Sequence, residues 1–272
     1  MISARLRSGS GAGPALSALA ADALDFLVGR SCLGCGGALP RGAAVCDACD
    51  ARVPRTGTVF CLRCMQEGNA PSDATRPGGG CPRHGSERLL LAGPAFEPPL
   101  DRVVRAFKYS GAREAHRWLT ALLPEPPGRG TPAWREYLLV PAPLHPARRA
   151  WRGFDQASLL AATAGAAWGI PVLPALERKR DTPAQARVDG ALRRENVRQA
   201  FALAADAGRA LRARPVLLVD DVATTGSTLL EAASALDAAA PSWVLSLAFA
   251  HGGLPGAPEP AFSTRVAAAP PV

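Results

Sequence analysis

Two adjacent carboxylates and a cluster of hydroxyl groups lie close together in the segment PVLLVDDVATTGSTLLEAA, residues 215–233. Asp220 and Asp221 follow a continuous aliphatic run, which predicts a strand that is buried on both faces and ends at these aspartates. A turn rich in threonine, serine and glycine comes next, and apolar residues then recur at helical spacing. Such a turn at a helix start offers backbone N–H groups, hydroxyl donors and the positive end of the helix dipole to an anion.

A phosphate beside two carboxylates would be repelled unless a neutral group lay between them. A sugar meets this requirement, because its hydroxyls can donate to Asp220 and Asp221 while its phosphate lies in the turn. We therefore expect a ribose phosphate; the alternative is a capped strand-turn-helix without a ligand. Thr228 and Glu231 have the spacing of a capping box, which predicts the helix start. The residues expected to hold the phosphate are Thr224, Thr225, Gly226, Ser227 and Thr228.

All seven cysteines lie between residues 32 and 81, in pairs separated by two residues, and a histidine completes the fourth pair. Such pairs are typical of tetrahedral zinc sites, because a tight turn with two intervening residues directs both side chains at one ion. Two closed, structural zinc ions are therefore expected. The eight candidate ligands are Cys32, Cys35, Cys46, Cys49, Cys61, Cys64, Cys81 and His84.

Two other uses of paired cysteines fit this pattern less well. The odd number of cysteines and the closing histidine argue against a disulfide scaffold, and a redox pair would not be repeated. Sequential pairing would give one site of four cysteines and one of three cysteines and a histidine; interleaved pairing is the alternative. Reduced thiolates indicate a cytoplasmic location.

The rest of the chain alternates short apolar runs with segments of helical spacing. This alternation favours an α/β fold with a mostly parallel sheet, in which ligands bind at the carboxyl ends of strands. The glycine patterns of dinucleotide-binding and P-loop folds are absent from the sequence. Strands are expected over residues 88–96, 137–143, 170–176, 215–219 and 243–250, and helices over residues 99–111, 112–123 and 153–169.

The formal charge of +8 suggests a nucleic-acid partner, but composition offers a simpler cause. Only two of the 31 basic residues, Lys108 and Lys179, are lysines, which indicates a nucleotide bias that favours arginine. No uninterrupted apolar run is long enough for a membrane span. The N-terminus superficially resembles a signal peptide, but Asp22 and Asp25 and the helical spacing favour an amphipathic helix over residues 1–29.

The segment VLLVDDVATTGST resembles the phosphoribosyl-pyrophosphate (PRPP) signature of type I phosphoribosyltransferases. The resemblance implies that Asp220 and Asp221 hold the ribose hydroxyls, that residues 224–228 hold the 5′-phosphate, and that Mg²⁺ binds with PRPP. Ala223 stands where the family usually has a larger aliphatic residue. Thr224 replaces an aspartate of the 6-oxopurine-specific members, which argues against a hypoxanthine- or guanine-specific enzyme.

Further segments extend the resemblance to ComF-type competence proteins, which pair an N-terminal zinc ribbon with a type I phosphoribosyltransferase domain. They are FKY, VPAPLHPARRAWRGFDQASLLA and RKRDTPAQARVDGALRRENVRQAF, which begin at residues 107, 140 and 178. We therefore expect a type I phosphoribosyltransferase-like parallel-sheet core with a small zinc-ribbon domain. The expected parts are the helix over residues 1–29, a double zinc ribbon over 30–86, the phosphoribosyltransferase-like domain over 87–251 and a disordered tail over 252–272.

The resemblance also suggests roles for charged residues outside the main motif. Lys108 stands out because the chain almost always uses arginine, and a compact ammonium suits a phosphate or a sugar. The alternatives for the arginines that follow residue 145 are a solvated helix face or contacts with nucleic-acid phosphates, and the alternative for the hood segment, residues 177–198, is an exposed charged loop. The candidates for the pyrophosphate side are Arg148, Arg149 and Arg152, and those for a flexible catalytic hood loop are Gln185, Arg194 and Asn196.

Two functions stay open from the sequence. In the first, the protein is an enzyme that transfers a phosphoribosyl group from PRPP to an acceptor that the sequence does not identify. In the second, the family resemblance implies a non-enzymatic factor in DNA uptake, with the PRPP site as a sensor or a vestige. Its partners would then be single-stranded DNA and a competence helicase or recombination mediator.

Overall fold

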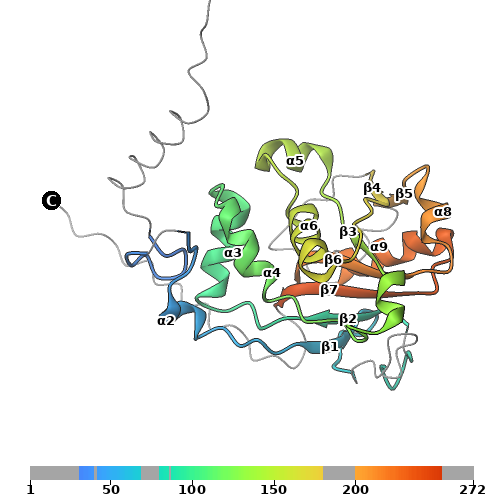
Figure 1. Cartoon of the computed structure of the whole chain (residues 1–272), viewed down its shortest axis with the longest axis horizontal. Coiled ribbons are helices and arrows are strands. Elements are labelled where there is room, and N and C mark those ends of the chain that lie inside the picture. Colours follow the sequence, from blue (N-terminus) through green and yellow to red (C-terminus); the bar gives the residue numbers. More distant parts are fainter. Residues whose placement is uncertain (1–30, 40–41, 69–79, 86, 180–199, 253–272) are drawn as a thin grey trace, which may run out of the picture.

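A five-stranded sheet forms the centre of the computed structural model, which describes residues 31–39, 42–68, 80–85, 87–179 and 200–252 (Figure 1). The strand order is β1-β2-β7-β6-β3, and β2, β7, β6 and β3 are parallel, with β1 antiparallel at the edge. The predicted mostly parallel α/β fold is thereby confirmed. The strands are β1 Thr58–Cys61, β2 Leu89–Ala92, β3 Leu138–Pro141, β6 Pro215–Ala223 and β7 Trp243–His251, and a separate ladder joins β4 Leu176–Arg178 to β5 Phe201–Leu203.

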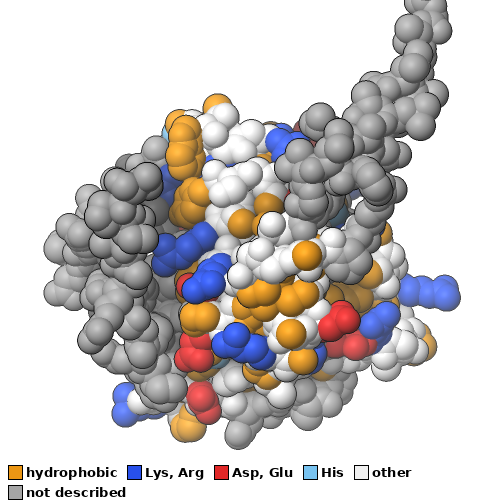
Figure 2. All heavy atoms as spheres, turned by 90° about the vertical axis from the view of Figure 1, so that its left-hand side faces the viewer, with side chains coloured by type: hydrophobic (Ala, Val, Ile, Leu, Met, Phe, Trp, Pro, Cys, Tyr) orange, Lys and Arg blue, Asp and Glu red, His pale blue; other side chains and the backbone are white. Residues whose placement is uncertain are grey.

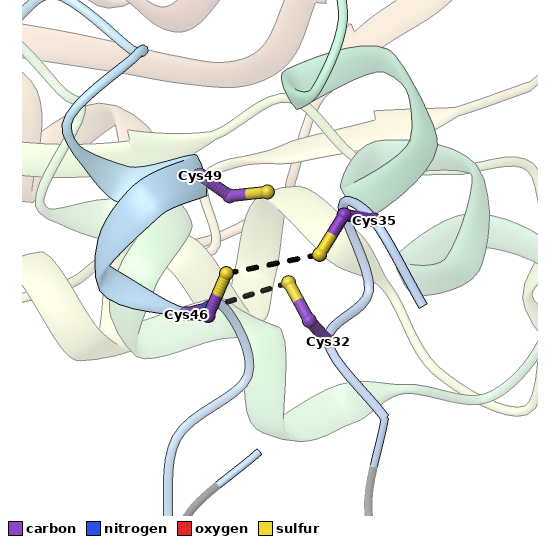
Figure 3. A group of neighbouring side chains, drawn as sticks. All are labelled: Cys32, Cys35, Cys46 and Cys49. Atoms are coloured by element: carbon purple, nitrogen blue, oxygen red, sulfur yellow. Dashed lines mark hydrogen bonds between the residues drawn. The ribbon is translucent and has the colours of Figure 1, made fainter. Parts of the chain in front are cut away.

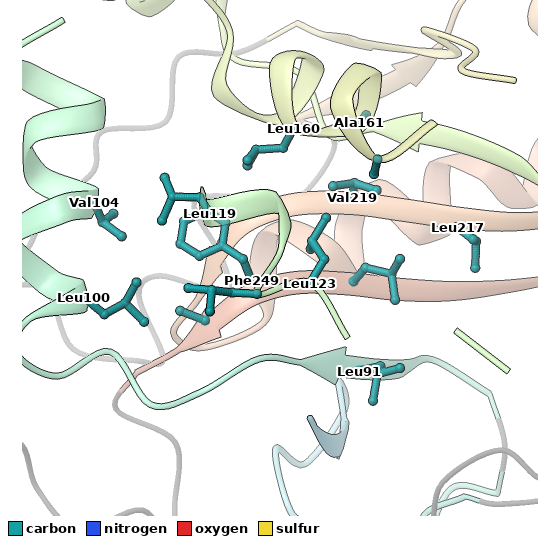
Figure 4. Close-up of a cluster of buried hydrophobic side chains, with 14 of the residues drawn as sticks. Leu91, Leu100, Val104, Leu119, Leu123, Leu160, Ala161, Leu217, Val219 and Phe249 are labelled. Carbon is teal, nitrogen blue, oxygen red and sulfur yellow. The ribbon is translucent and has the colours of Figure 1, made fainter. Parts of the chain in front are cut away.

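Alternate residues of the strands supply two hydrophobic cores, one on each face of the sheet. Leu217 and Val219 of β6 belong to one core, whereas Val216 and Leu218 belong to the other. Figure 4 shows the first core, where Leu119 and Phe249 lie between the helices and the sheet. The helices on this side are α3 Leu100–Tyr109, α4 His116–Thr120 and α6 Gln156–Trp168, and those of the second core are α8 Ala207–Leu211 and α9 Ser227–Leu236.

The segment predicted to form the zinc ribbons is part of this architecture. Its strand β1 extends the central sheet by pairing with β2. Cys32 and Cys49, the latter in the short helix α2 (Asp47–Asp50), lie in the same core as Val103 and Phe107 of α3. The predicted domain limits stay predictions. The remaining elements are α5 Pro146–Arg152 and the 3₁₀ turns Arg113–Ala115, Pro132–Glu136 and Asp237–Ala239.

Three local predictions are wrong. Of the strand predicted over residues 170–176, only a single bridge at Val172 and the first residue of β4, Leu176, are formed, because Pro171 and Pro174 donate no ladder hydrogen bonds. The helix predicted over residues 112–123 is divided into a 3₁₀ turn and α4. Strand β6 does not end before the aspartates but continues to Ala223, since its ladder with β7 extends to His251.

Several predictions lie wholly or largely outside the described residues. They are the helix over residues 1–29, the tail beyond Gly252, and the hood-loop candidates Gln185, Arg194 and Asn196. Within the described part of the chain, no helix is both long and apolar enough to span a membrane.

Gly93, directly after β2, provides a test of the packing. A Cβ atom at this position would lie 2.1 Å from the carbonyl oxygen of Phe249 and 2.6 Å from that of Leu122, so the backbone would have to shift. Gly93→Ala should therefore lower the free energy of unfolding in urea by about 3 kcal/mol. Gly208→Ala is the control, because its methyl group would meet only Leu203, at 3.5 Å. Equal stability of the two variants would contradict this packing.

Candidate functional site

The two aspartates lie near the carboxyl end of β6. Asp220 is half-buried and Asp221 is buried, as expected for neighbours that alternate along a strand. Each carboxylate accepts a hydrogen bond from the next backbone N–H: Asp221 N lies 2.8 Å from Asp220 Oδ1, and Val222 N lies 2.6 Å from Asp221 Oδ1. These bonds hold both carboxylates in place at the edge of the sheet where ligands bind in parallel α/β folds.

Lys108 reaches the second aspartate from α3. Its Nζ lies 2.8 Å from Asp221 Oδ2, and the two side chains are only 18% and 13% exposed. Val103, Val104 and Phe107 anchor α3 in the core, so the last turn of the helix holds the ammonium against β6. The structure thus brings Lys108, predicted as a candidate from its rarity, into contact with the aspartate pair.

The charge of Asp220 is less well balanced by a nearby cation than that of Asp221, which contacts Lys108. Burial and the neighbouring charge of Asp221 raise the pKa of Asp220 to about 7, although Lys108 and Arg178 act in the opposite direction. Arg178 ends β4, where its guanidinium carbon lies 5.2 Å from the centre of the Phe201 ring. The sequence prediction did not include this arginine, since its segment had the composition of an exposed charged loop.

The predicted phosphate turn connects β6 to α9. Gly226 is the N-cap residue of α9 and has φ +68°, and the helix begins at Ser227. Thr228 therefore lies inside the helix and the predicted capping box is wrong, because the left-handed Gly226 is the N-cap residue, two positions before Thr228. The hydroxyl oxygens of Thr225 and Ser227 lie 2.9 Å apart. The first N–H groups of α9 have no acceptor within the helix, so the turn offers amide and hydroxyl donors together.

The turn packs directly against the second cysteine cluster. A Cβ atom at Gly226 would lie 2.6 Å from Met65 Sδ and 2.8 Å from Leu62 Cδ2. Leu62 lies between Cys61 and Cys64 in the sequence, and Met65 follows them. The segment of the second cluster thus supports the backbone of the turn, a contact that no local sequence pattern indicates.

The first cysteine cluster has the geometry of a zinc site (Figure 3). Its ligand atoms all lie within 4.8 Å of one another, and Cys35 Sγ lies 3.8 Å from Cys46 Sγ. A tetrahedron with zinc–sulfur bonds of ~2.3 Å has edges of the same size, about 3.8 Å. Burial raises the pKa of the Cys32 thiol, but backbone N–H groups, that of Cys46 foremost, outweigh it and lower the pKa to about 6. The four members are Cys32, Cys35, Cys46 and Cys49.

The second cluster consists of Cys61, Cys64, Cys81 and His84. Cys64 Sγ and Cys81 Sγ lie 3.6 Å apart, and His84 Nδ1 lies 3.4 Å from Cys61 Sγ and 3.5 Å from Cys81 Sγ. The ring therefore faces the sulfurs with Nδ1, and the N–H of Arg83 lowers the pKa of Cys81 to about 6. Both clusters fit zinc, and their membership shows the sequential arrangement rather than the interleaved one.

The first cluster also packs against α3, the helix that carries Lys108. A Cβ atom at Gly34 would lie 2.9 Å from Pro99 Cβ, and Arg102 Nη1 donates to Gly34 O at 3.3 Å. Pro99 is the N-cap residue of α3, the helix that ends with Lys108 and Tyr109. Each cluster is thus in contact with one of the two elements around the aspartates.

The predicted pyrophosphate arginines lie on α5, which has no buried residue. Arg149 is exposed, whereas Arg148 and Arg152 are half-buried. Arg152 Nη1 donates to Gln156 Oε1 at 3.0 Å, and its guanidinium carbon lies 5.3 Å from the centre of the Tyr109 ring. Because Tyr109 follows Lys108, α5 lies beside the end of α3 that reaches the aspartates.

Fold and site together define an α/β protein with a parallel sheet, an acidic pair beside a helix start, and two cysteine clusters suited to zinc. The chain matches no protein-family model. It is 31% identical over 201 residues to DNA utilization protein YhgH of Salmonella typhi, a match that covers 71% of this chain and 83% of that protein. The chain belongs to the ComF-type competence protein family.

Other relatives agree with this assignment. Competence protein F of Haemophilus influenzae is 35% identical over 133 residues, which are 48% of this chain and 52% of that protein. The match thus spans about half of the length of this relative. YhgH of Escherichia coli K12 is 29% identical over 201 residues, with the same coverage as the Salmonella protein.

Metal analysis tests the two clusters. The intact protein should contain two zinc ions per chain, because each set of four ligands closes one tetrahedron. Cys35→Ser and Cys61→Ser, one from each cluster, should each lower the content by one ion and lower the unfolding temperature, since structural zinc contributes to folding. An unchanged zinc content in either variant, or a wild-type protein without zinc, would contradict the assignment.

The raised pKa of Asp220 predicts a pH-dependent stability. Its charged form is disfavoured in the folded protein, so the penalty is complete above pH 7 and disappears as the pH falls towards the unfolded value near 4. Asp220→Asn removes the charge and should stabilise the protein by about 2 kcal/mol at pH 8. The gain, measured by urea denaturation from pH 4 to pH 8, should shrink as the pH falls; a gain independent of pH would show that burial does not disfavour this carboxylate.

Proposed function

We propose that this protein binds PRPP at the carboxyl end of β6 and transfers its phosphoribosyl group to an acceptor. The observation that carries the proposal is the direct succession of two aspartates, a hydroxyl-rich turn with Gly226 in a left-handed conformation, and the start of α9. Ribose hydroxyls would donate to Asp220 and Asp221, and the 5′-phosphate would accept from N–H and hydroxyl groups of residues 224–228. The low exposure of the aspartates strengthens such hydrogen bonds.

The cations around the site suit the leaving group of this reaction. Transfer would break the bond between ribose C1 and a pyrophosphate oxygen, pyrophosphate would leave with the bonding pair, and the acceptor would form the new bond to C1. Mg²⁺ bound with PRPP would neutralise the pyrophosphate. Lys108 and Arg178 act electrostatically on the aspartates. We assign the arginines of α5 to the pyrophosphate side.

The names of the relatives support a biological setting for this chemistry. Competence protein F and DNA utilization protein YhgH point to the uptake and use of DNA, and we assign this chain to the same process. Its partners would be single-stranded DNA and a competence helicase or recombination mediator. The thiolate clusters favour the cytoplasm, where cysteines stay reduced.

Calorimetry with PRPP and Mg²⁺ tests the pocket. The wild-type protein should bind, and Asp221→Ala should lose binding, because it removes an acceptor and leaves Lys108 without its carboxylate partner. Asp206→Ala is the matched control, since Asp206 is exposed at the start of α8 and makes no side-chain cap there. Failure of the wild-type protein to bind, or equal binding by the Asp221 variant, would refute the proposed pocket.

The second candidate function is a non-enzymatic competence factor in which PRPP is sensed but not consumed. Oxygen-18 placed in the bridge between C1 and pyrophosphate distinguishes the two without knowledge of the acceptor. Reversible cleavage lets the label move to non-bridging positions of PRPP, as the enzyme proposal predicts. Binding without any exchange, in the presence of a nucleic acid as well, would favour the sensor.

A further inference from the structure

Two aromatic side chains lie together on the surface near the Lys108–Asp221 ion pair. Tyr109, at the end of α3, is 59% exposed, and Trp151 of α5 is 72% exposed; among the described residues they are the large hydrophobic side chains that face solvent. Their ring centres are 6.0 Å apart and the ring planes are inclined by 54°. An exposed aromatic pair is uncommon on a soluble domain and marks a surface that contacts another molecule.

The same surface is strongly basic. Arg152 places its guanidinium carbon 5.3 Å from the centre of the Tyr109 ring. Arg148 and Arg149 precede Trp151 on α5, which carries no acidic residue and buries none of its side chains. Figure 1 shows α5 at the upper edge of the molecule, and Figure 2 shows hydrophobic and basic side chains in contact on the upper part of the neighbouring face. The partner must therefore offer both flat apolar groups and negative charge.

We propose that the surface formed by Tyr109, Trp151 and the arginines of α5 binds a single-stranded nucleic acid. Unpaired bases expose the π-faces that stack on aromatic rings, and phosphates pair with arginine; the bases of a duplex are not accessible in this way. A protein partner with a purely apolar face would have to desolvate the exposed Arg149 without offering it an anion. Charge complementarity and ring geometry thus favour a single strand over these alternatives.

This surface lies next to the Lys108–Asp221 ion pair, so a bound strand would lie near the aspartates. Tyr109 directly follows Lys108, whose ammonium is 2.8 Å from the Asp221 carboxylate. A strand stacked on Tyr109 therefore passes close to the carboxyl end of β6. This proposal rests on the proposed function, which names single-stranded DNA as a partner and places the α5 arginines on the pyrophosphate side; it adds the residues that would bind the strand.

Fluorescence anisotropy with labelled oligo-dT and oligo-rU of about 20 nucleotides tests the surface with the full chain. The wild-type protein should bind at least one of them with an affinity that falls steeply with salt. Trp151→Ala should weaken binding about 10-fold, and the double variant Tyr109→Ala/Trp151→Ala about 100-fold, whereas Trp151→Phe should retain stacking and affinity. Arg129→Ala, in an exposed pair with Glu125 away from α3 and α5, is the control for non-specific loss of charge and should bind like the wild type.

A second readout connects binding to this position. Bound bases should quench the tryptophan emission, and Trp151→Phe should lose most of the quenching while it retains affinity, because Trp151 is the exposed tryptophan. No single-strand binding by the wild-type protein, or equal affinity of the double variant, would overturn the proposal. Circular dichroism shows whether the double variant is folded, and PRPP binding by the wild-type protein, measured separately, keeps failure here distinct from failure of the proposed PRPP site.

Discussion

The site depends on the packing of the two cysteine clusters against α3 and against the turn that precedes α9. The first cluster packs through Gly34 onto the beginning of α3, and the second lies beneath Gly226 through Leu62 and Met65. Buried side chains such as Val59, Phe60 and Met65 attach these segments to the two cores of the sheet, and bound metal would add to this by fixing the shape of each cluster. Loss of metal would therefore disturb the positions of Lys108 and of the turn at Gly226, although neither belongs to a cysteine cluster.

The charges of the aspartate pair are only partly balanced by nearby cations. Two neighbouring carboxylates of low exposure repel each other, and the protein balances this with Lys108 against Asp221 and with Arg178 at longer range. Burial and the charge of Asp221 disfavour the charged form of Asp220, as is common where acceptors are concentrated in a binding site. A ligand with hydroxyl donors relieves this cost, because its hydrogen bonds stabilise the charged form. An anion alone would not, since it meets the same carboxylates.

The features that could be predicted are those encoded by neighbouring residues. Cysteine pairs with two intervening residues and aliphatic runs such as the one before Asp220 specify local structures, so the grouping of the candidate zinc ligands and four of the five predicted strands were confirmed. The length of β6 and the interruptions by Pro171 and Pro174 were missed, because they depend on ladder hydrogen bonds with other strands. The contact of Met65 with Gly226 and the pairing of Tyr109 with Trp151 join distant parts of the chain, and no local pattern encodes them.

The central claim is that a sugar phosphate lies between the aspartate pair of β6 and the turn that begins α9. A crystal structure of the zinc-loaded protein with ribose 5-phosphate tests it most directly. The account predicts sugar hydroxyls within hydrogen-bond distance of Asp220 and Asp221, and the phosphate on the N–H groups of residues 224–228. A sugar phosphate bound at any other place, with the Lys108–Asp221 pair unchanged and the turn empty, would contradict it.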